Sequence, residues 1–202
     1  TSSIPSALTD LPQGVRVVSS DDTLAGEVWG SPLILLAVKP QQYCKIKESV
    51  SRFQLNAQSP KPLLISVLAG ITLKSLKKAF PEHTCVRVVP NTPSLVGQGL
   101  TGLAWDDEIT LDQKKVVRKI FEPISEIYEL EEQKLDPFLA LTSSGPAYIA
   151  LVVEAMADGA VAAGLPRYLS NQLAHKTLSG TASLLRKKGL HPAELKDMVA
   201  SP

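Results

Sequence analysis

The chain carries three short apolar runs, each of strand length and each ending in turn-forming residues. The runs cover residues 33–38, 63–68 and 85–89. The run over residues 33–38 is uninterrupted, which is typical of a strand that is covered on both faces, as in a parallel sheet. The stretches between them are long enough for helices, which predicts βαβ units in a doubly wound α/β sheet.

The residues that follow these three strands are predicted to lie together, because ligands bind at the carboxyl ends of the strands in open α/β sheets. The ends carry Lys39-Pro40, Ala69-Gly70 and Asn91-Thr92-Pro93. Each segment alone is equally typical of a simple turn, since Gly, Pro and Asn are common turn residues. Their convergence on one edge of the sheet favours a binding site over three unrelated turns.

The alternation of strands and helices continues to about residue 135. Thr72 can cap a helix whose apolar positions are Leu73, Leu76 and Ala79. The other elements expected in this half are helices over residues 41–53 and 111–121, and strands over residues 15–18, 100–105 and 124–130.

The second half is predicted to be helical, with helices over residues 146–163, 167–188 and 192–199. Pro146 suits the first turn of a helix, and its cap is expected among Ser143, Ser144 and Gly145. The first of these helices is apolar nearly all round, a pattern typical of a buried helix. Too few residues remain in this half to cover it, so we expect its apolar surface to meet another subunit.

The charge balance argues against two classes of partner. Lys and Arg total 21 and Asp and Glu total 20, a net charge of +1, which gives no electrostatic reason to expect nucleic acid or an anionic membrane. No uninterrupted apolar run reaches the ~18 residues of a membrane span. The residues after Thr1 do not resemble a signal peptide. We therefore expect a soluble, cytoplasmic protein.

The cysteines and histidines do not form a metal site in the sequence. Cys44 and Cys85 have no metal-ligand spacing, and two buried thiols in a reducing compartment are favoured over a single disulfide. His83, His175 and His191 are isolated from one another and from the cysteines. We expect them to be surface or capping residues, with no catalytic base and no metal ligand among them.

Six motifs occur in a fixed order and together resemble pyrroline-5-carboxylate reductases. The resemblance runs from about residue 14 to residue 202. It implies a Rossmann-like nucleotide-binding domain over residues 1–136 and an all-α dimerisation domain over residues 137–202. The motifs are residues 37–40 (AVKP), 69–72 (AGIT), 90–93 (PNTP), 143–148 (SSGPAY), 154–159 (EAMADG) and 191–202 (HPAELKDMVASP).

Two loops of the family are not found in the sequence. Family members begin with a strand and a glycine-rich turn that holds the cofactor pyrophosphate at a helix N-terminus. They also continue beyond the Ser-Pro of the last motif with a Gly-Gly-x-Thr loop and further helices. We therefore expect both domains to be incomplete in this sequence.

The resemblance also assigns site residues. Asp21 falls where the family often has an asparagine, which weakens the match there, and Asn91 could either bond to the nicotinamide side of the site or hold its own loop. The substrate contacts implied are Glu132, Ser144 and Ser201. The cofactor contacts implied are Ser2, Ser3, Asp21, Ala37, Val38, Lys39, Pro40, Val67, Leu68, Ala69, Gly70, Asn91 and Met198.

The activity implied is reduction of 1-pyrroline-5-carboxylate to L-proline, the last step of proline biosynthesis, with NADPH as cofactor or NADH as its alternative. Hydride would add to the C=N carbon of a cyclic imine, whose nitrogen gains a proton. Positioning alone can supply ~7–11 kcal/mol of barrier reduction, so no side chain is assigned as a catalytic acid. The family resemblance also implies a homodimer or a larger homo-oligomer.

Two other functions share parts of this pattern. A β-hydroxyacid dehydrogenase has the same α/β-plus-helical layout, but that family resembles a pattern with Lys followed by Asn on its first long helix. Residues 146–163 contain neither. A non-catalytic nucleotide-binding fragment is the second alternative, favoured only if the native chain lacks both glycine-rich loops.

Overall fold

The computed structural model describes residues 13, 15, 25–50 and 61–200. The chain divides into two compact units, Thr1–Ser143 and Ser144–Pro202. The division expected after residue 136 lies inside the last helix of the first unit.

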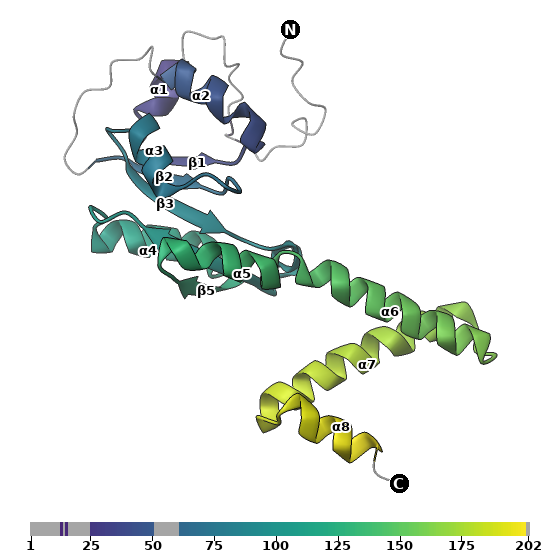
Figure 1. The fold of residues 1–202 in the computed structure, drawn as a ribbon. Helices are drawn as coiled ribbons and strands as arrows, with labels where there is room; N and C mark the ends of the chain where they lie inside the picture. Colours follow the sequence, from purple (N-terminus) through teal and green to yellow (C-terminus); the bar gives the residue numbers. More distant parts are fainter. Residues whose placement is uncertain (1–12, 14, 16–24, 51–60, 201–202) are drawn as a thin grey trace, which may run out of the picture. The chain divides into compact units, whose positions relative to one another are not determined.

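The first unit is built on one five-stranded sheet, which Figure 1 shows at its centre. Its strands follow one another across the sheet in chain order. The first three are parallel, the fourth runs antiparallel to the third, and the fifth is parallel to the fourth. The strands are β1 (Leu33–Leu36), β2 (Leu63–Ser66), β3 (Thr84–Val89), β4 (Gly99–Trp105) and β5 (Ser125–Glu129).

The reversal at β4 departs from the parallel arrangement predicted for a doubly wound sheet. Only a short connection containing the 3₁₀ turn η3 (Thr92–Val96) joins β3 to β4. A parallel crossover needs about a dozen residues or more. The connection is too short for one, so β4 returns beside β3 in the opposite direction.

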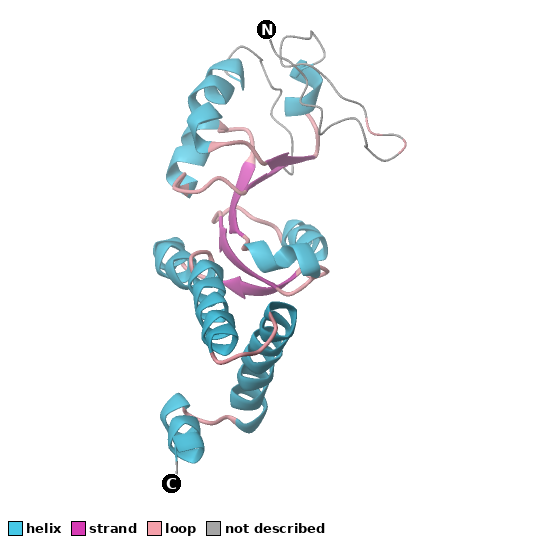
Figure 2. Ribbon diagram, turned by 90° about the vertical axis from the view of Figure 1, so that its right-hand side faces the viewer, coloured by secondary structure: helices cyan, strands magenta, loops and turns pink. Residues whose placement is uncertain are grey.

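Helices cover both faces of this sheet, and Figure 2 shows them on either side of the strands. Along β3, Cys85 and Val89 join the core under α2, α3 and α5, while Val86 and Val88 join the core under α4. This alternation is the ordinary two-residue period of a strand. The helices of this unit are α1 (Ala25–Trp29), η2 (Pro40–Gln42), α2 (Tyr43–Val50), α3 (Leu73–Ala79), α4 (Leu111–Phe121), η4 (Glu132–Lys134) and α5 (Leu135–Thr142).

Two helix starts in this unit carry the caps that their sequences encode. Thr72 Oγ1 accepts a hydrogen bond from the backbone N–H of Ser75 at 3.2 Å, and the predicted apolar positions of α3 are buried. Thr110 and Gln113 form a reciprocal capping box at the start of α4. The helix predicted over residues 111–121 is confirmed at both ends.

The second unit consists of three helices, as the sequence predicts. They are α6 (Gly145–Ala162), α7 (Arg167–Lys188) and α8 (Pro192–Ala200). Gly164, with φ of 103°, lies in the turn after α6, and Gly189, with φ of 64°, ends α7. These are backbone conformations that glycine adopts without a side-chain clash. Ser144 occupies the cap position of α6 but makes no side-chain capping bond.

Within one chain α6 is not buried nearly all round, which agrees with the expectation that its own unit is too small to cover it. Only Val153 and Ala157 of α6 are buried, and they pack against Ala174 of α7. Leu151 stays 65 % exposed and Tyr148 63 % exposed. A two-helix hairpin can cover only one stripe of each helix, so the remaining apolar surface has no cover from its own unit.

The segment Glu132–Ala162 contains a stretch of 18 residues apolar enough to be considered for a membrane span. That test rests on length and composition alone. In the structure the segment is not one continuous helix, because α5 ends at Thr142 and α6 begins at Gly145.

Two expectations about single side chains also need correction. Cys85 is buried but Cys44 is exposed, and both are free thiols; burial raises the pKa of Cys85 to about 12. His83 is 3 % exposed, not a surface residue, and its Nε2 lies 3.0 Å from the carbonyl oxygen of Trp29. His191 does act as a cap, since its Nδ1 accepts from the backbone N–H of Ala193.

Candidate functional site

The carboxyl ends of β1, β2 and β3 open at the same edge of the sheet. Leu36 is paired with Ser66, and Ser66 with Arg87, so β1 and β2 end in register and β3 continues two residues further, to Val89. The backbone N–H of Val67 donates to the carbonyl of Leu36 at 3.1 Å, which extends the pairing of β1 and β2 by one step. The three segments that follow the strands therefore leave the sheet side by side.

Small or exposed residues dominate the first two of these segments. Ala37, Lys39 and Pro40 are exposed after β1, as are Ala69 and Gly70 after β2. A side chain at Gly70 would meet no atom within 4 Å, and its φ of 73° favours glycine. A flat ligand can therefore approach the backbone of this turn closely.

The aliphatic residues beside them are available mainly through their backbone. Leu68 is 1 % exposed and belongs to the core beneath the sheet. Val38 and Val67 are half-buried. Their side chains fix the course of the chain, and their peptide groups lie at the strand ends.

Asn91, in the third segment, is held by two hydrogen bonds. Its Nδ2 donates to the carbonyl oxygen of Thr142 at 3.0 Å, and its Oδ1 accepts from the backbone N–H of Leu100 at 2.8 Å. The residue is 9 % exposed. Both ends of the amide thus bond to the first unit itself.

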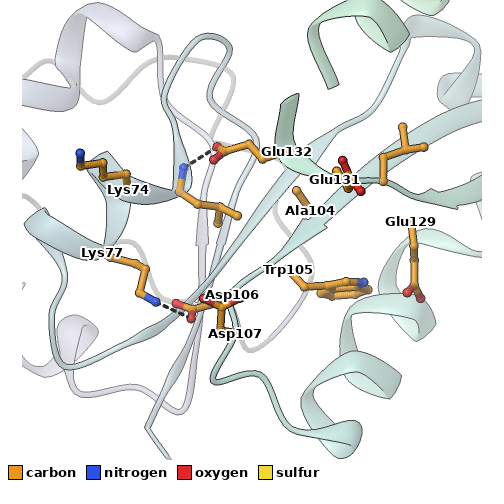
Figure 3. A pocket seen from close by; sticks show the side chains of 11 residues that line it. Lys74, Lys77, Ala104, Trp105, Asp106, Asp107, Glu129, Glu131 and Glu132 are labelled. Carbon is orange, nitrogen blue, oxygen red and sulfur yellow. Dashed lines mark hydrogen bonds and ion pairs between the residues drawn. The ribbon is translucent and has the colours of Figure 1, made fainter. Parts of the chain in front are cut away.

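Glu132 joins two elements of the first unit. Its Oε1 accepts from the backbone N–H of Leu73, the first residue of α3, at 2.6 Å, as Figure 3 shows. The same oxygen lies 3.4 Å from Nη1 of Arg87. Glu132 is therefore a partly buried residue that links α3 to β3.

The other predicted contacts fall into two groups. Ser144, at the start of α6, and Met198, in α8, are exposed residues of the second unit. Four more lie outside the described residues: Ser2, Ser3, Asp21 and Ser201.

Arg87 lies in β3, close to the strand ends, and is not part of any of the six sequence motifs. Its side chain is 3 % exposed, and Nη2 lies 3.0 Å from Oδ1 of Asp136. Its Nε has no hydrogen-bond partner among the described residues. The available signal was an arginine inside a strand that is otherwise apolar or small, because a buried charge needs a partner.

A groove of about 670 Å³ lies between α3 and the ends of β4 and β5, and Figure 3 shows its lining. Lys77 Nζ bonds to Oδ1 of Asp106 at 2.8 Å. Burial alone raises the pKa of Asp106, but bonds from Lys77 and from the backbone N–H groups of Glu108 and Cys85 outweigh it and lower that pKa. The Asp106 carboxyl in this groove is therefore paired with Lys77 and favoured in its charged form.

The described residues contain no group of three or more His, Cys, Asp or Glu side chains placed to hold a metal ion. The polar contacts described near the strand ends are the hydrogen bonds of the Asn91 amide and the ion pairs of Arg87.

The second half of the chain matches a known family region. The profile described as pyrroline-5-carboxylate reductase dimerisation matches residues 132–202.

Curated relatives extend the similarity over most of the chain. A pyrroline-5-carboxylate reductase of Synechocystis sp. is 41 % identical over 92 % of this chain and 67 % of its own length. The corresponding protein of Glycine max is 41 % identical over 94 % of this chain and 66 % of its own. The chain therefore spans about two thirds of the length of these relatives.

A solved structure is similar in both fold and sequence. The Plasmodium falciparum pyrroline carboxylate reductase with NADP bound superposes with a TM-score of 0.74 and 32 % identity. The match covers 84 % of this chain and 66 % of that one.

Proposed function

The chain belongs to the pyrroline-5-carboxylate reductase family, and we propose on that premise that it reduces 1-pyrroline-5-carboxylate to L-proline with a reduced nicotinamide cofactor. The observation that carries the proposal lies at the carboxyl ends of β1, β2 and β3. Exposed small residues follow the first two strands there, and no atom lies within 4 Å of a Cβ placed on Gly70. Proline formation is the last step of proline biosynthesis, and we assign the protein to the cytoplasm.

The strand-end segments fit a dinucleotide. At Gly70 no atom lies within 4 Å of a side chain built there, so a planar ring can lie against the backbone. The proposed cofactor contacts are Ala37, Val38, Lys39, Pro40, Val67, Leu68, Ala69, Gly70 and Met198, with Ser2, Ser3 and Asp21 on the adenosine side. Asn91 follows the third strand and bonds to Thr142 and Leu100.

NADPH is the proposed cofactor, since NADP is bound to the Plasmodium relative, and NADH is the alternative. When bound, it supplies the hydride. The chain's own residues bind and orient the reactants, which is where most of the barrier reduction is expected to arise.

Glu132, Ser144 and Ser201 are the proposed substrate contacts. The serine hydroxyls can donate to the carboxylate of the substrate. Oε1 of Glu132 is used by Leu73 and Arg87, and Oε2 has no hydrogen bond within the described residues. That oxygen is free to accept from the ring N–H once the imine nitrogen is protonated.

The second unit supports a homo-oligomer, in agreement with the match of residues 132–202 to the family's dimerisation region. We propose that its exposed apolar helices face a second copy and not lipid. We propose neither nucleic acid nor a membrane as a partner.

The direct test is turnover. NADPH oxidation is followed after addition of pyrroline-5-carboxylate, and L-proline is identified by mass spectrometry. We expect stoichiometric proline formation, with NADH measured in parallel. No turnover with either cofactor, or turnover only with a β-hydroxyacid and the oxidised cofactor, would contradict the assignment.

A variant tests whether the strand ends bind the cofactor. Ala69→Leu places bulk where the backbone must be approached, so the KM for NADPH should rise by about tenfold or more. The matched control is Ala163→Leu, at an exposed alanine beyond the end of α6. Equal KM values for the two variants would place the cofactor elsewhere.

A further inference from the structure

Helix α5 is fastened to β3 at both of its ends. At its start, Nη2 of Arg87 lies 3.0 Å from Oδ1 of Asp136. At its end, Nδ2 of Asn91 donates to the carbonyl oxygen of Thr142 at 3.0 Å. Arg87 lies within β3 and Asn91 lies just beyond its end, four residues apart, so both positions belong to the α5 side of the sheet.

The helix also packs on β4 without a gap. A Cβ added to Gly102 would lie 2.9 Å from Cδ2 of Leu135 and 3.0 Å from Cδ1 of Phe138. No side chain fits between α5 and this strand. Helix α5 therefore has little freedom to shift, because it packs tightly on β4 and is held by the Arg87–Asp136 ion pair and the Asn91–Thr142 hydrogen bond.

The last turn of α5 is also held by hydrogen bonds within the helix itself. Thr142 is buried, and its Oγ1 donates to the carbonyl of Phe138 at 2.8 Å. The backbone N–H of Ser143 donates to the carbonyl of Leu139 at 2.9 Å. Ser144, a proposed substrate contact, is the next residue along the chain.

The amide of Asn91 is already engaged at both ends. Oδ1 and the amide nitrogen each keep one further hydrogen-bonding position, but only 9 % of the residue is exposed, so a nicotinamide carboxamide has little access to either while the bonds to Leu100 and Thr142 hold. Displacing a buried hydrogen bond costs free energy unless the new bond is as good. The two roles that the sequence leaves open for Asn91 are therefore not equally compatible with its contacts.

We infer that Asn91 is a positioning residue of the reductase, which fixes the end of α5 from which Ser143 and Ser144 continue, and is not a cofactor contact. This inference rests on the proposed function, because Ser144 is assigned to the substrate there. Arg87 does the same for the start of α5, through Asp136.

The test uses Asn91→Asp, which keeps the acceptor for Leu100 and loses the donor to Thr142. With two oxygens facing each other, we expect the KM for the imine to rise about tenfold and kcat to fall. The Kd for NADPH, measured by fluorescence titration, should stay within about twofold. Asn171→Asp is the matched control, since Asn171 is exposed on α7.

Two readouts separate positioning from a general structural defect. The carboxyl introduced by Asn91→Asp donates again once it is protonated, so the activity of this variant relative to the unsubstituted protein should recover as the pH falls. Hydrogen exchange should become faster in Asn91→Asp at the amides of residues 141–145, and stay unchanged in Asn171→Asp. The exchange measurement requires no reductase activity.

The outcomes are distinguishable. A tenfold weaker NADPH affinity with unchanged exchange at residues 141–145 would overturn the inference and restore Asn91 as a cofactor contact. Unchanged kinetics and unchanged exchange would also overturn it. If the unsubstituted protein does not turn over, the proposed function fails, while the exchange measurement still decides whether Asn91 fixes the end of α5.

Discussion

The two units of the chain bury their apolar side chains in different ways. The first unit covers the middle of its sheet with its own helices, and every residue of β2 and β3 is buried, while Leu33 and Leu35 of the edge strand β1 are exposed. In the second unit α6 and α7 bury only Val153, Ala157 and Ala174 between them among the hydrophobic residues. The first unit has a buried core of its own, whereas the second presents apolar surface that we propose a second copy of the chain covers.

Burying the exposed apolar surface of α6 would contribute a large free energy. Fully burying a large apolar side chain contributes roughly 1.5–3 kcal/mol. Tyr148, Leu151, Val152 and Met156 are all exposed on α6. Covering them with a second copy is worth several kcal/mol, which is comparable to the whole stability of a small domain.

The largest effect should come from charging that surface. Leu151→Glu places a carboxylate in the proposed interface, where an unpaired charge is strongly unfavourable. We expect loss of the oligomer and a lower melting temperature. The matched variant is Leu111→Glu, because Leu111 is 77 % exposed at the start of α4.

Leu111→Glu should leave the oligomer intact, since a carboxylate is favourable at a helix N-terminus. Size-exclusion chromatography with light scattering measures both variants. If both variants had the same oligomeric state, the exposed apolar surface of α6 would not be the interface between copies.

The next effect tests the buried core of the first unit. Gly102→Ala forces a Cβ within 3 Å of Leu135 and Phe138, and overpacking of this kind costs ~1–3 kcal/mol. The control is Gly30→Ala, whose Cβ would meet only the carbonyl of Glu27, at 3.7 Å. Urea unfolding should show the loss for Gly102→Ala alone; a core that tolerated it would be looser than the contacts indicate.

A smaller difference is expected at two helix starts. Thr110→Ala removes a capping bond of α4 and should destabilise the first unit by ~1 kcal/mol. Ser144→Ala removes a hydroxyl that makes no capping bond at α6, so the free energy of unfolding should hardly change while the KM for the imine rises. A similar loss of stability in both variants would contradict these assignments.

The smallest effect concerns pH. Burial lowers the pKa of His83 below its ordinary 6.5, despite the bond to Trp29, and Nδ1 has no partner among the described residues. The neutral ring is favoured in the folded state, so its contribution to stability is complete above pH 6.5 and declines as the pH falls toward the depressed pKa.

The variant that tests this pH dependence is His83→Gln. Unfolding of the first unit should lose part of its dependence between pH 7 and pH 5 in this variant. An identical pH profile in His83→Gln and in the unsubstituted protein would contradict the role of burial.

Much of the fold follows from sequence periodicity. The apolar runs become β1–β3, and the Thr72 and Thr110 caps mark α3 and α4 where they were expected. Helix α5 was not predicted, because Asp136-Pro137 within Leu135–Thr142 is not a strong helical pattern. The direction of β4 follows from the length of its connection, which periodicity does not report.

The candidate site was predictable in outline only. Strand-end residues could be grouped, because parallel neighbours must end at one edge. The partners of Asn91 could not be, since Thr142 is 51 residues away in sequence. The exposure of α6 within one chain could be predicted, because too few residues remain in its half of the sequence to cover an apolar helix.

The measurement that tests the central contrast most directly is the molar mass in solution. One chain has a mass of 21.7 kDa. Sedimentation equilibrium over a range of concentrations should give at least twice that mass, with no stable monomer, because the second unit is completed by another copy. A stable monomer with a folded, cooperatively unfolding second unit would contradict the account.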